Sequence, residues 1–195
     1  MNYVIAKIIS TVLDPIVLTI LAILIILLPT DGSTISVHMI LYTGSILAYI
    51  TLPWIIFVAW AKWTKQISNW DMSVRAERTA TFTKAIPLFL LEYAGIWLIG
   101  NEALIRVATI YIGILLLYFL ITKYWMKASG HMTTLIINTA IMYAMTKNIY
   151  ILFSLFLTIP LLAVSRKTLK RHSVAELIVG TLFGSICGGA FILFL

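Results

Sequence analysis

Arginine, histidine and glutamate follow one another at close spacing in one polar stretch of the sequence, residues 165–176. Arg166 is followed by His172, and Glu176 stands about one helical turn after that histidine. A histidine can attack phosphorus when a carboxylate fixes its tautomer and supports the imidazolium that forms. The planar guanidinium group of arginine matches phosphate oxygens. This stretch is therefore predicted to bind an anion and to offer it a nucleophile.

A second polar stretch carries Lys127 and the sequence Ser129-Gly130-His131, directly before an apolar run. Backbone N–H groups at the start of a helix attract anions, and a glycine there lets the anion come close. A second histidine can protonate a leaving alkoxide and then activate water. Lys127, Ser129 and Gly130 are therefore candidate phosphate ligands.

A third polar stretch, from Lys62 to Arg78, adds two arginines. Arg75 and Arg78 share one face if this stretch is helical. The single cysteine, Cys187, lies in an apolar run, and the histidines lack the spacing of a zinc site. No carboxylate cluster suits Mg²⁺. The three stretches together predict phosphoryl transfer without a metal ion or any other cofactor.

The order of these motifs resembles that of the type 2 phosphatidic acid phosphatases, part of a superfamily of histidine phosphatases that includes the vanadium haloperoxidases. The pattern of that family is K-x6-R-P, then P-S-G-H, then S-R-x5-H-x3-D. The third motif matches at Ser165-Arg166 and His172, with Glu176 in place of the aspartate. The second reads Ala128-Ser129-Gly130-His131 and lacks only the proline.

The first motif of the family is matched in part. Arg78 fits its arginine, whereas Asp71 stands where the lysine is expected and Ala80 lies near the place of the proline. Arg75, one helical turn before Arg78, is a candidate replacement for that lysine. The resemblance covers the chain from about Lys62 to its C-terminus, and the order of the three motifs makes it specific.

The resemblance implies a role for each matching residue. It makes His172 the nucleophile, His131 the general acid and Glu176 the carboxylate that orients the nucleophile. Arg78 and Arg166 become phosphate clamps. The implied activity is hydrolysis of a lipid phosphate monoester or diphosphate through a phosphohistidine intermediate. Candidate substrates are phosphatidate-like lipids, a lipid glycerophosphate and polyprenyl phosphates.

Other interpretations of the third stretch stay open. Ser173 and Glu176 also form a capping-box pattern, which gives Glu176 a second candidate role at the start of a helix. Lys167, Lys170 and Arg171 suit anchoring at the membrane interface.

The composition predicts that lipid surrounds most of the chain. Of the 195 residues, 62% are apolar and 11% are charged, against roughly 25% charged in soluble domains. The basic residues stand at the ends of apolar runs, which favours lipid headgroups over nucleic acid as their partner. The expected fold is an all-α membrane protein, a bundle of about six to seven transmembrane helices. We expect one domain, 1–195, with the three charged loops converging on one face.

The apolar runs predict membrane spans at 1–28, 35–60, 82–99, 103–121, 132–145, 149–164 and 174–195. Asp14-Pro15 predicts a helix start within the first span. Glycines at every fourth position from Gly180 to Gly188 predict close packing by the last span. Glu92 and Arg106, in neighbouring spans, are expected to pair.

Two other functions fit the same residues. One is a phosphotransferase that passes the phosphoryl group to an alcohol instead of water, and the other is a non-catalytic lipid-phosphate-binding protein or transporter. The lysines and arginines other than Arg106 and Lys147 fall on the side of the three loops. The positive-inside rule therefore predicts a multi-pass cell-membrane protein whose site faces the cytoplasm.

Overall fold

The computed structural model describes residues 1–29 and 33–194. In these residues the regular structure is entirely helical, which confirms the all-α class. The described chain contains six helical segments that are long and apolar enough to cross a membrane. These segments are Tyr3–Leu27, Val37–Trp63, Arg75–Ile99, Glu102–Trp125, Ile149–Thr168 and Val174–Phe194. The expected multi-pass membrane bundle is therefore confirmed.

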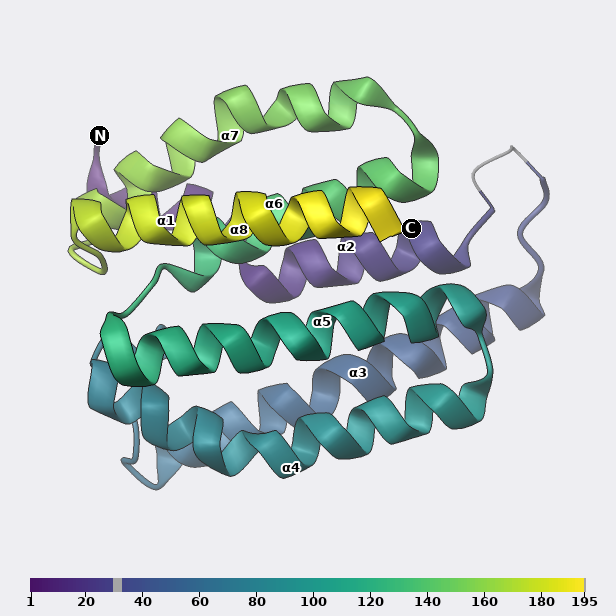
Figure 1. Ribbon diagram of the computed structural model, residues 1–195, viewed down its shortest axis with the longest axis horizontal. Helices are drawn as coiled ribbons and strands as arrows, with labels where there is room; N and C mark the ends of the chain where they lie inside the picture. Colours follow the sequence, from purple (N-terminus) through teal and green to yellow (C-terminus); the bar gives the residue numbers. More distant parts are fainter. Residues whose placement is uncertain (30–32, 195) are drawn as a thin grey trace. The chain divides into compact units, whose positions relative to one another are not determined.

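The chain forms two compact units (Figure 1). The first, which we call the five-helix unit, comprises Met1–Thr34 and Ala128–Leu195. The second, the three-helix unit, comprises Ile35–Lys127. The second polar stretch of the sequence is divided between them, because Lys127 and Ala128 belong to different units. A single domain over 1–195 and the convergence of all three charged loops stay predictions.

The five-helix unit is built around helix α6. Its elements are α1 (Tyr3–Val12), α2 (Pro15–Leu27), α6 (Gly130–Thr146), α7 (Ile149–Thr168) and α8 (Val174–Phe194). Helix α6 packs against α2, α7 and α8, and Figure 1 shows α6 and α8 side by side. Ten of the 17 residues of α6 are buried, so it is the core helix of this unit. It corresponds to the span expected at 132–145, and its length is below the about 20 residues that a bilayer requires.

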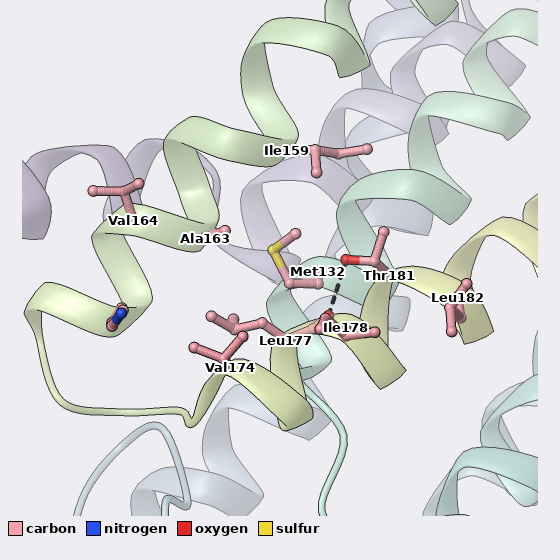
Figure 2. A pocket seen from close by; sticks show the side chains of 10 residues that line it. Met132, Ile159, Ala163, Val164, Val174, Leu177, Ile178, Thr181 and Leu182 are labelled. Carbon is pink, nitrogen blue, oxygen red and sulfur yellow. Dashed lines mark hydrogen bonds between the residues drawn. The ribbon is translucent and has the colours of Figure 1, made fainter.

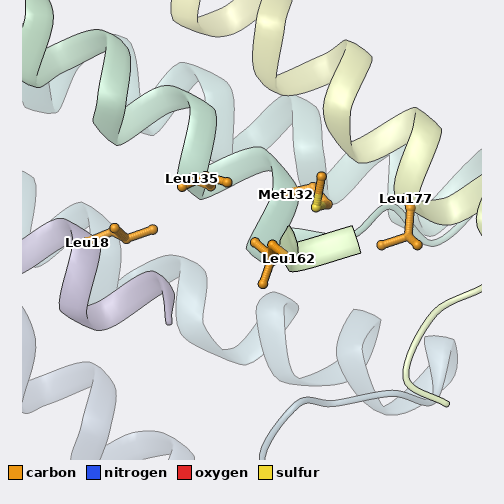
Figure 3. Packing of buried hydrophobic residues seen from close by; sticks show 5 residues of the cluster. All are labelled: Leu18, Met132, Leu135, Leu162 and Leu177. Atoms are coloured by element: carbon orange, nitrogen blue, oxygen red, sulfur yellow. The ribbon is translucent and has the colours of Figure 1, made fainter. Parts of the chain in front are cut away.

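A small apolar cluster joins four helices of this unit (Figure 3). Leu18 comes from α2, Leu162 from α7 and Leu177 from α8, and Met132 and Leu135 come from α6. Leu162 is fully buried and Met132 is nearly so. These side chains set the position of the first turn of α6 against the first turn of α8.

The glycines of α8 lie against α6, which confirms the predicted packing. A Cβ atom at Gly184 would lie 3.1 Å from Thr133 Cα, and one at Gly188 would lie 3.1 Å from Ala140 Cβ. Lipid tails are as apolar as the side chains that they surround, so close backbone contact is a main source of helix association in a membrane. The glycines allow that contact along α6 as far as Ala140.

A break at Asp14 separates α1 from α2. Asp14 is the N-cap of α2, and its Oδ1 atom accepts a hydrogen bond of 2.9 Å from the N–H group of Ile16. Pro15 occupies the first helical position, where a missing N–H costs nothing. The expected helix start is confirmed. It also places a carboxylate in the middle of an apolar segment that is long enough to span a membrane.

The three-helix unit contains α3 (Val37–Trp63), α4 (Arg75–Ile99), α5 (Glu102–Leu120) and the short π-helix η1 (Ile121–Trp125). Helix α4 packs against both α3 and α5. It begins at Arg75 and not at the expected residue 82, so the polar residues before the apolar run are helical as well. This early start places Arg75 and Arg78 in the first turns of α4.

The expected pairing of Glu92 with Arg106 is wrong. Arg106 lies 3.6 Å from Glu102, one turn earlier on α5, and both of these side chains are exposed. Glu92 is buried in α4, and its Oε1 atom makes no hydrogen bond within residues 1–29 and 33–194. Arg106 therefore pairs with Glu102 on its own helix, and the carboxyl group of Glu92 is buried without this arginine as its partner.

Candidate functional site

His172 and Glu176 form the centre of the candidate site in the five-helix unit. The Nδ1 atom of His172 lies 3.0 Å from Glu176 Oε2, and the histidine side chain is 1% exposed. A carboxylate on Nδ1 favours the tautomer that carries a proton there, which leaves the lone pair on Nε2. This tautomer is the one that a histidine nucleophile would use.

Glu176 performs the capping role as well. Its Oε2 atom accepts a hydrogen bond of 3.1 Å from the N–H group of Ser173, and its own N–H donates to Ser173 Oγ at 3.2 Å. This reciprocal pair is a capping box at the start of α8. The two interpretations of Glu176 are compatible, because one carboxylate oxygen contacts both His172 and the backbone of Ser173.

The Ser129-Gly130-His131 motif is attached to the same residue. The N–H group of Ser129 donates to the backbone carbonyl of Glu176 at 3.0 Å. Ser129 is the N-cap of α6, yet its hydroxyl is fully buried and makes no hydrogen bond within the described residues. A Cβ atom at Gly180 would lie 2.6 Å from Ser129 O, so α8 closes tightly on this loop. The second and third motifs are thereby brought together.

His131 faces a carboxylate that the motifs do not include. Its Nε2 atom lies 3.6 Å from Asp14 Oδ2, and the two side chains are 11% and 36% exposed. Asp14 comes from the break between α1 and α2, far from His131 in the sequence. Each histidine of the candidate site thus has a carboxylate on one of its ring nitrogens.

Arg166 is buried in the last turn of α7 and is 1% exposed. Its Nη1 atom donates to Ser10 Oγ on α1 at 2.7 Å. The neighbouring Ser165 hydroxyl donates to the carbonyl of Ala6 on the same helix at 2.6 Å. The charge of Arg166 also acts on the carboxylate of Asp14. Helix α1 therefore holds the candidate phosphate clamp in place.

Burial divides the basic residues of the third motif into two groups. Arg166 lies inside the unit, whereas Lys167 and Lys170 are exposed and Arg171 is half-buried. Exposed lysines at a helix end suit contact with lipid headgroups. A buried arginine is instead typical of a specific anion ligand or a structural pair.

Two cations of the three-helix unit gather at one loop. Arg78 is buried, and it donates to Tyr118 Oη at 2.8 Å and to the carbonyls of Asp71 and Met72. Lys127 is also buried, and its Nζ atom donates to the carbonyl of Ser73 at 2.6 Å. Three consecutive carbonyls, at residues 71–73, therefore hold both cations.

Arg75 is used differently from Arg78 although the two are one helical turn apart. Its Nε atom donates to the carbonyl of Thr122 at 2.6 Å, and its Nη2 atom donates to that of Lys123 at 2.9 Å. These carbonyls lie in η1, where the helical hydrogen bonding of α5 ends. Arg75 thus caps a helix end. Its guanidinium group does not contact the carbonyls of residues 71–73 that hold Arg78 and Lys127.

An apolar groove runs between α6, α7 and α8 (Figure 2). Its volume is about 320 Å³, and its walls include Met132, Ile159 and Leu177. Lys167, in the last turn of α7, is the only charged residue of its lining among those that the structure describes. Met132 follows His131 directly in the chain, so the groove begins beside the second motif.

Sequence reasoning missed two residues of this site, Asp14 and Ser10. The Asp14-Pro15 pattern predicts only a helix cap, yet an ionisable residue within a membrane span indicates function by default. That signal was present in the sequence. Nothing comparable marked Ser10, whose contact with Arg166 depends on the packing of α1 against α7.

No family model, curated protein or solved structure matches the chain. Among the described residues, no group of three or more histidine, cysteine or acidic side chains is placed to hold a metal ion.

Proposed function

We propose that the protein is a membrane phosphatase that hydrolyses a lipid phosphate monoester or diphosphate through a phosphohistidine at His172. The observation that supports this most is the buried His172–Glu176 pair, to which the loop carrying His131 is hydrogen-bonded. Glu176, in the first turn of α8, thus contacts both the proposed nucleophile and the loop that precedes the second histidine. The chemistry needs no metal ion.

In the first step, His172 Nε2 attacks phosphorus and a new P–N bond forms. The bond between phosphorus and the lipid oxygen breaks, and its electron pair stays on that oxygen, which takes a proton from His131. Glu176 stabilises the positive charge that develops on the His172 ring. The lipid alcohol or lipid monophosphate then leaves.

In the second step, His131 takes a proton from water as the water oxygen attacks phosphorus. The P–N bond breaks, its electron pair returns to His172 Nε2, and inorganic phosphate is released. The same histidine therefore acts first as an acid and then as a base. If an alcohol replaces water in this step, the protein acts as a phosphotransferase.

Charge on the transferred phosphoryl group requires fixed donors. In the five-helix unit, buried Arg166, the hydroxyl of Ser129 and the N-terminal N–H groups of α6 at Gly130 are suited to this task. By the resemblance, Arg78 has the same task. Lys127 is a better replacement for the missing family lysine than Arg75, because it shares a loop with Arg78 while Arg75 caps η1.

The groove between α6, α7 and α8 is proposed to hold a hydrocarbon chain of the substrate. Its apolar walls favour an acyl or isoprenyl chain, and Lys167 suits the polar end of such a lipid. Phosphatidate-like lipids, a lipid glycerophosphate and polyprenyl phosphates all meet this description. The site is proposed to face the cytoplasm from the cell membrane. Labelling of a cysteine placed near Ser129 by a membrane-impermeant reagent in intact cells would contradict that orientation.

The test is phosphate release by the purified protein in EDTA, with each candidate lipid as substrate. The expected result is turnover that His172→Ala abolishes and that His38→Ala, a change at an exposed histidine of α3, leaves intact. Undiminished turnover by the His172 variant would overturn the mechanism. Binding of the lipid without phosphate release would favour a non-catalytic protein, and transfer to an added alcohol would favour a phosphotransferase.

A further inference from the structure

Asp14 has two oxygens with two different partners. The Oδ1 atom accepts from the N–H group of Ile16 and caps α2, whereas Oδ2 faces His131 Nε2 at 3.6 Å. The cap needs only a neutral oxygen, and Asn or Ser supplies one equally well. A charged group in an apolar segment is costly, so the presence of a carboxylate at position 14 indicates a second role beside the cap.

We infer that Asp14 is a positioning residue for His131, holding its imidazole so that the other ring nitrogen, Nδ1, delivers the proton to the leaving group. This inference rests on the proposed function and assigns the site a second carboxylate–histidine pair. It also gives the N-terminal helices, which lie outside the family resemblance, a part in the reaction.

The geometry supports this assignment in three ways. The His131 side chain is mostly buried, so its ring orientation is set by its contacts and not by water. The contact uses Nε2, which directs proton transfer to Nδ1. Among the residues that the structure describes, the charged groups of His131 and Arg166 act on the Asp14 carboxylate, and both residues belong to the candidate site.

The proton balance of both steps fits this arrangement. In the first step the P–O bond breaks, and the lipid oxygen takes the Nδ1 proton from a doubly protonated His131. The Nε2–H group stays directed at Asp14 throughout, so the neutral ring keeps its orientation. In the second step Nδ1 takes a proton from the attacking water, and the ring returns to its first state.

The experiment compares two substrates of different leaving-group basicity. A lipid alkyl phosphate needs a proton on its departing alcohol, whereas p-nitrophenyl phosphate releases a phenolate that leaves without one. For Asp14→Asn, kcat/KM for the alkyl phosphate is expected to fall about 100-fold, and that for the aryl phosphate less than about 3-fold. The same variant is expected to release a burst of nitrophenol, because slower water activation lets the phosphoenzyme accumulate.

Controls separate this role from folding and from the cap. Glu102→Gln removes a carboxylate from an exposed ion pair on α5. It is expected to leave kcat/KM unchanged for both substrates. Asp14→Ser keeps a capping oxygen without charge, and it serves where the Asn variant does not reach the membrane. If Asp14→Asn lowers kcat/KM equally for both substrates, or for neither, the inference is overturned. If the unaltered protein releases phosphate from neither substrate, the proposed function itself fails, and the inference fails with it.

Discussion

The carboxylate of Glu176 lies 3.0 Å from His172 Nδ1 and 3.1 Å from the N–H group of Ser173, through the same oxygen. A helix cap and the orientation of a candidate nucleophile thus depend on one atom. Any rotation of the first turn of α8 would move the histidine together with its carboxylate. The two roles can nevertheless be separated by mutation. The cap needs only an oxygen that accepts a hydrogen bond, whereas stabilising the imidazolium of His172 needs a negative charge.

Glu176→Gln tests the charge of this carboxylate. A glutamine oxygen can still accept from Ser173, but it cannot stabilise the imidazolium of His172. Activity is expected to fall about 100-fold or more, with little change in the thermal unfolding midpoint. The matched variant Ser173→Ala should do the reverse, with a stability loss of about 1 kcal/mol and activity largely kept. Full activity in the Gln variant would leave Glu176 with the cap alone.

Gly180→Ala tests the closeness of α8 to the Ser129 loop. The added Cβ atom would lie 2.6 Å from Ser129 O and 2.9 Å from Ser129 N, both of which are backbone atoms. The loop must therefore shift, with an expected loss of about 1–3 kcal/mol and of most of the activity. Gly189→Ala is the control, since nothing lies within 4 Å of its added Cβ atom. Equal behaviour of the two variants in a thermal unfolding and activity assay would refute the tight contact.

Lys127→Met and Arg75→Gln test which cation replaces the family lysine. Loss of Lys127 is expected to lower kcat/KM about 100-fold, as expected when a donor to the phosphoryl group is removed. Loss of Arg75 should cost about 1 kcal/mol of stability, because exposed carbonyls of η1 lose their donor, and should leave kcat/KM within about 3-fold. The opposite ranking of the two variants would restore Arg75 as the replacement.

Glu92→Leu tests the buried carboxyl group in α4. Its Oε1 atom makes no hydrogen bond in the part of the chain that the structure describes, so burying it costs free energy. The leucine variant is expected to raise the free energy of unfolding by about 1–3 kcal/mol without loss of activity. Thermal unfolding in detergent measures this. A loss of activity at unchanged stability would show that Glu92 has a functional role.

Ala163→Phe tests the groove between α6, α7 and α8. The larger side chain would fill part of its volume of about 320 Å³, so long-chain substrates should lose affinity and short-chain ones should not. Leu157→Phe, on an exposed part of α7 outside the groove, is the control. The measurement is the KM of each variant for substrates of increasing chain length. An unchanged profile in the Ala163 variant would exclude the groove as the chain-binding site.

Local sequence patterns predicted the elements of this structure well. Asp14-Pro15 marked the start of α2, the Ser173–Glu176 capping box marked the start of α8, and the glycines from Gly180 to Gly188 marked its packing face. Each of these signals depends on neighbours within a few residues, which is why a sequence shows them. The pairing of His172 with Glu176 followed for the same reason.

Contacts between distant segments were harder to predict. The Asp14–His131 pair and the Arg166–Ser10 hydrogen bond depend on how α1 and α2 pack on α6 and α7. The wrong pairing of Glu92 with Arg106 has the same origin, since Glu102 offered Arg106 a partner on its own helix. The partner of Arg75 was equally hidden, because it consists of backbone carbonyls.

Detection of the covalent intermediate tests the central claim most directly. The purified protein is mixed with a lipid phosphate in EDTA and quenched at alkaline pH, where phosphohistidine survives, and its peptides are then analysed by mass spectrometry. We predict a phosphoryl group on His172, absent from His172→Ala and present in larger amount in Asp14→Asn when p-nitrophenyl phosphate replaces the lipid phosphate. Phosphate release without any phosphoryl group on His172 in either active protein would contradict the account.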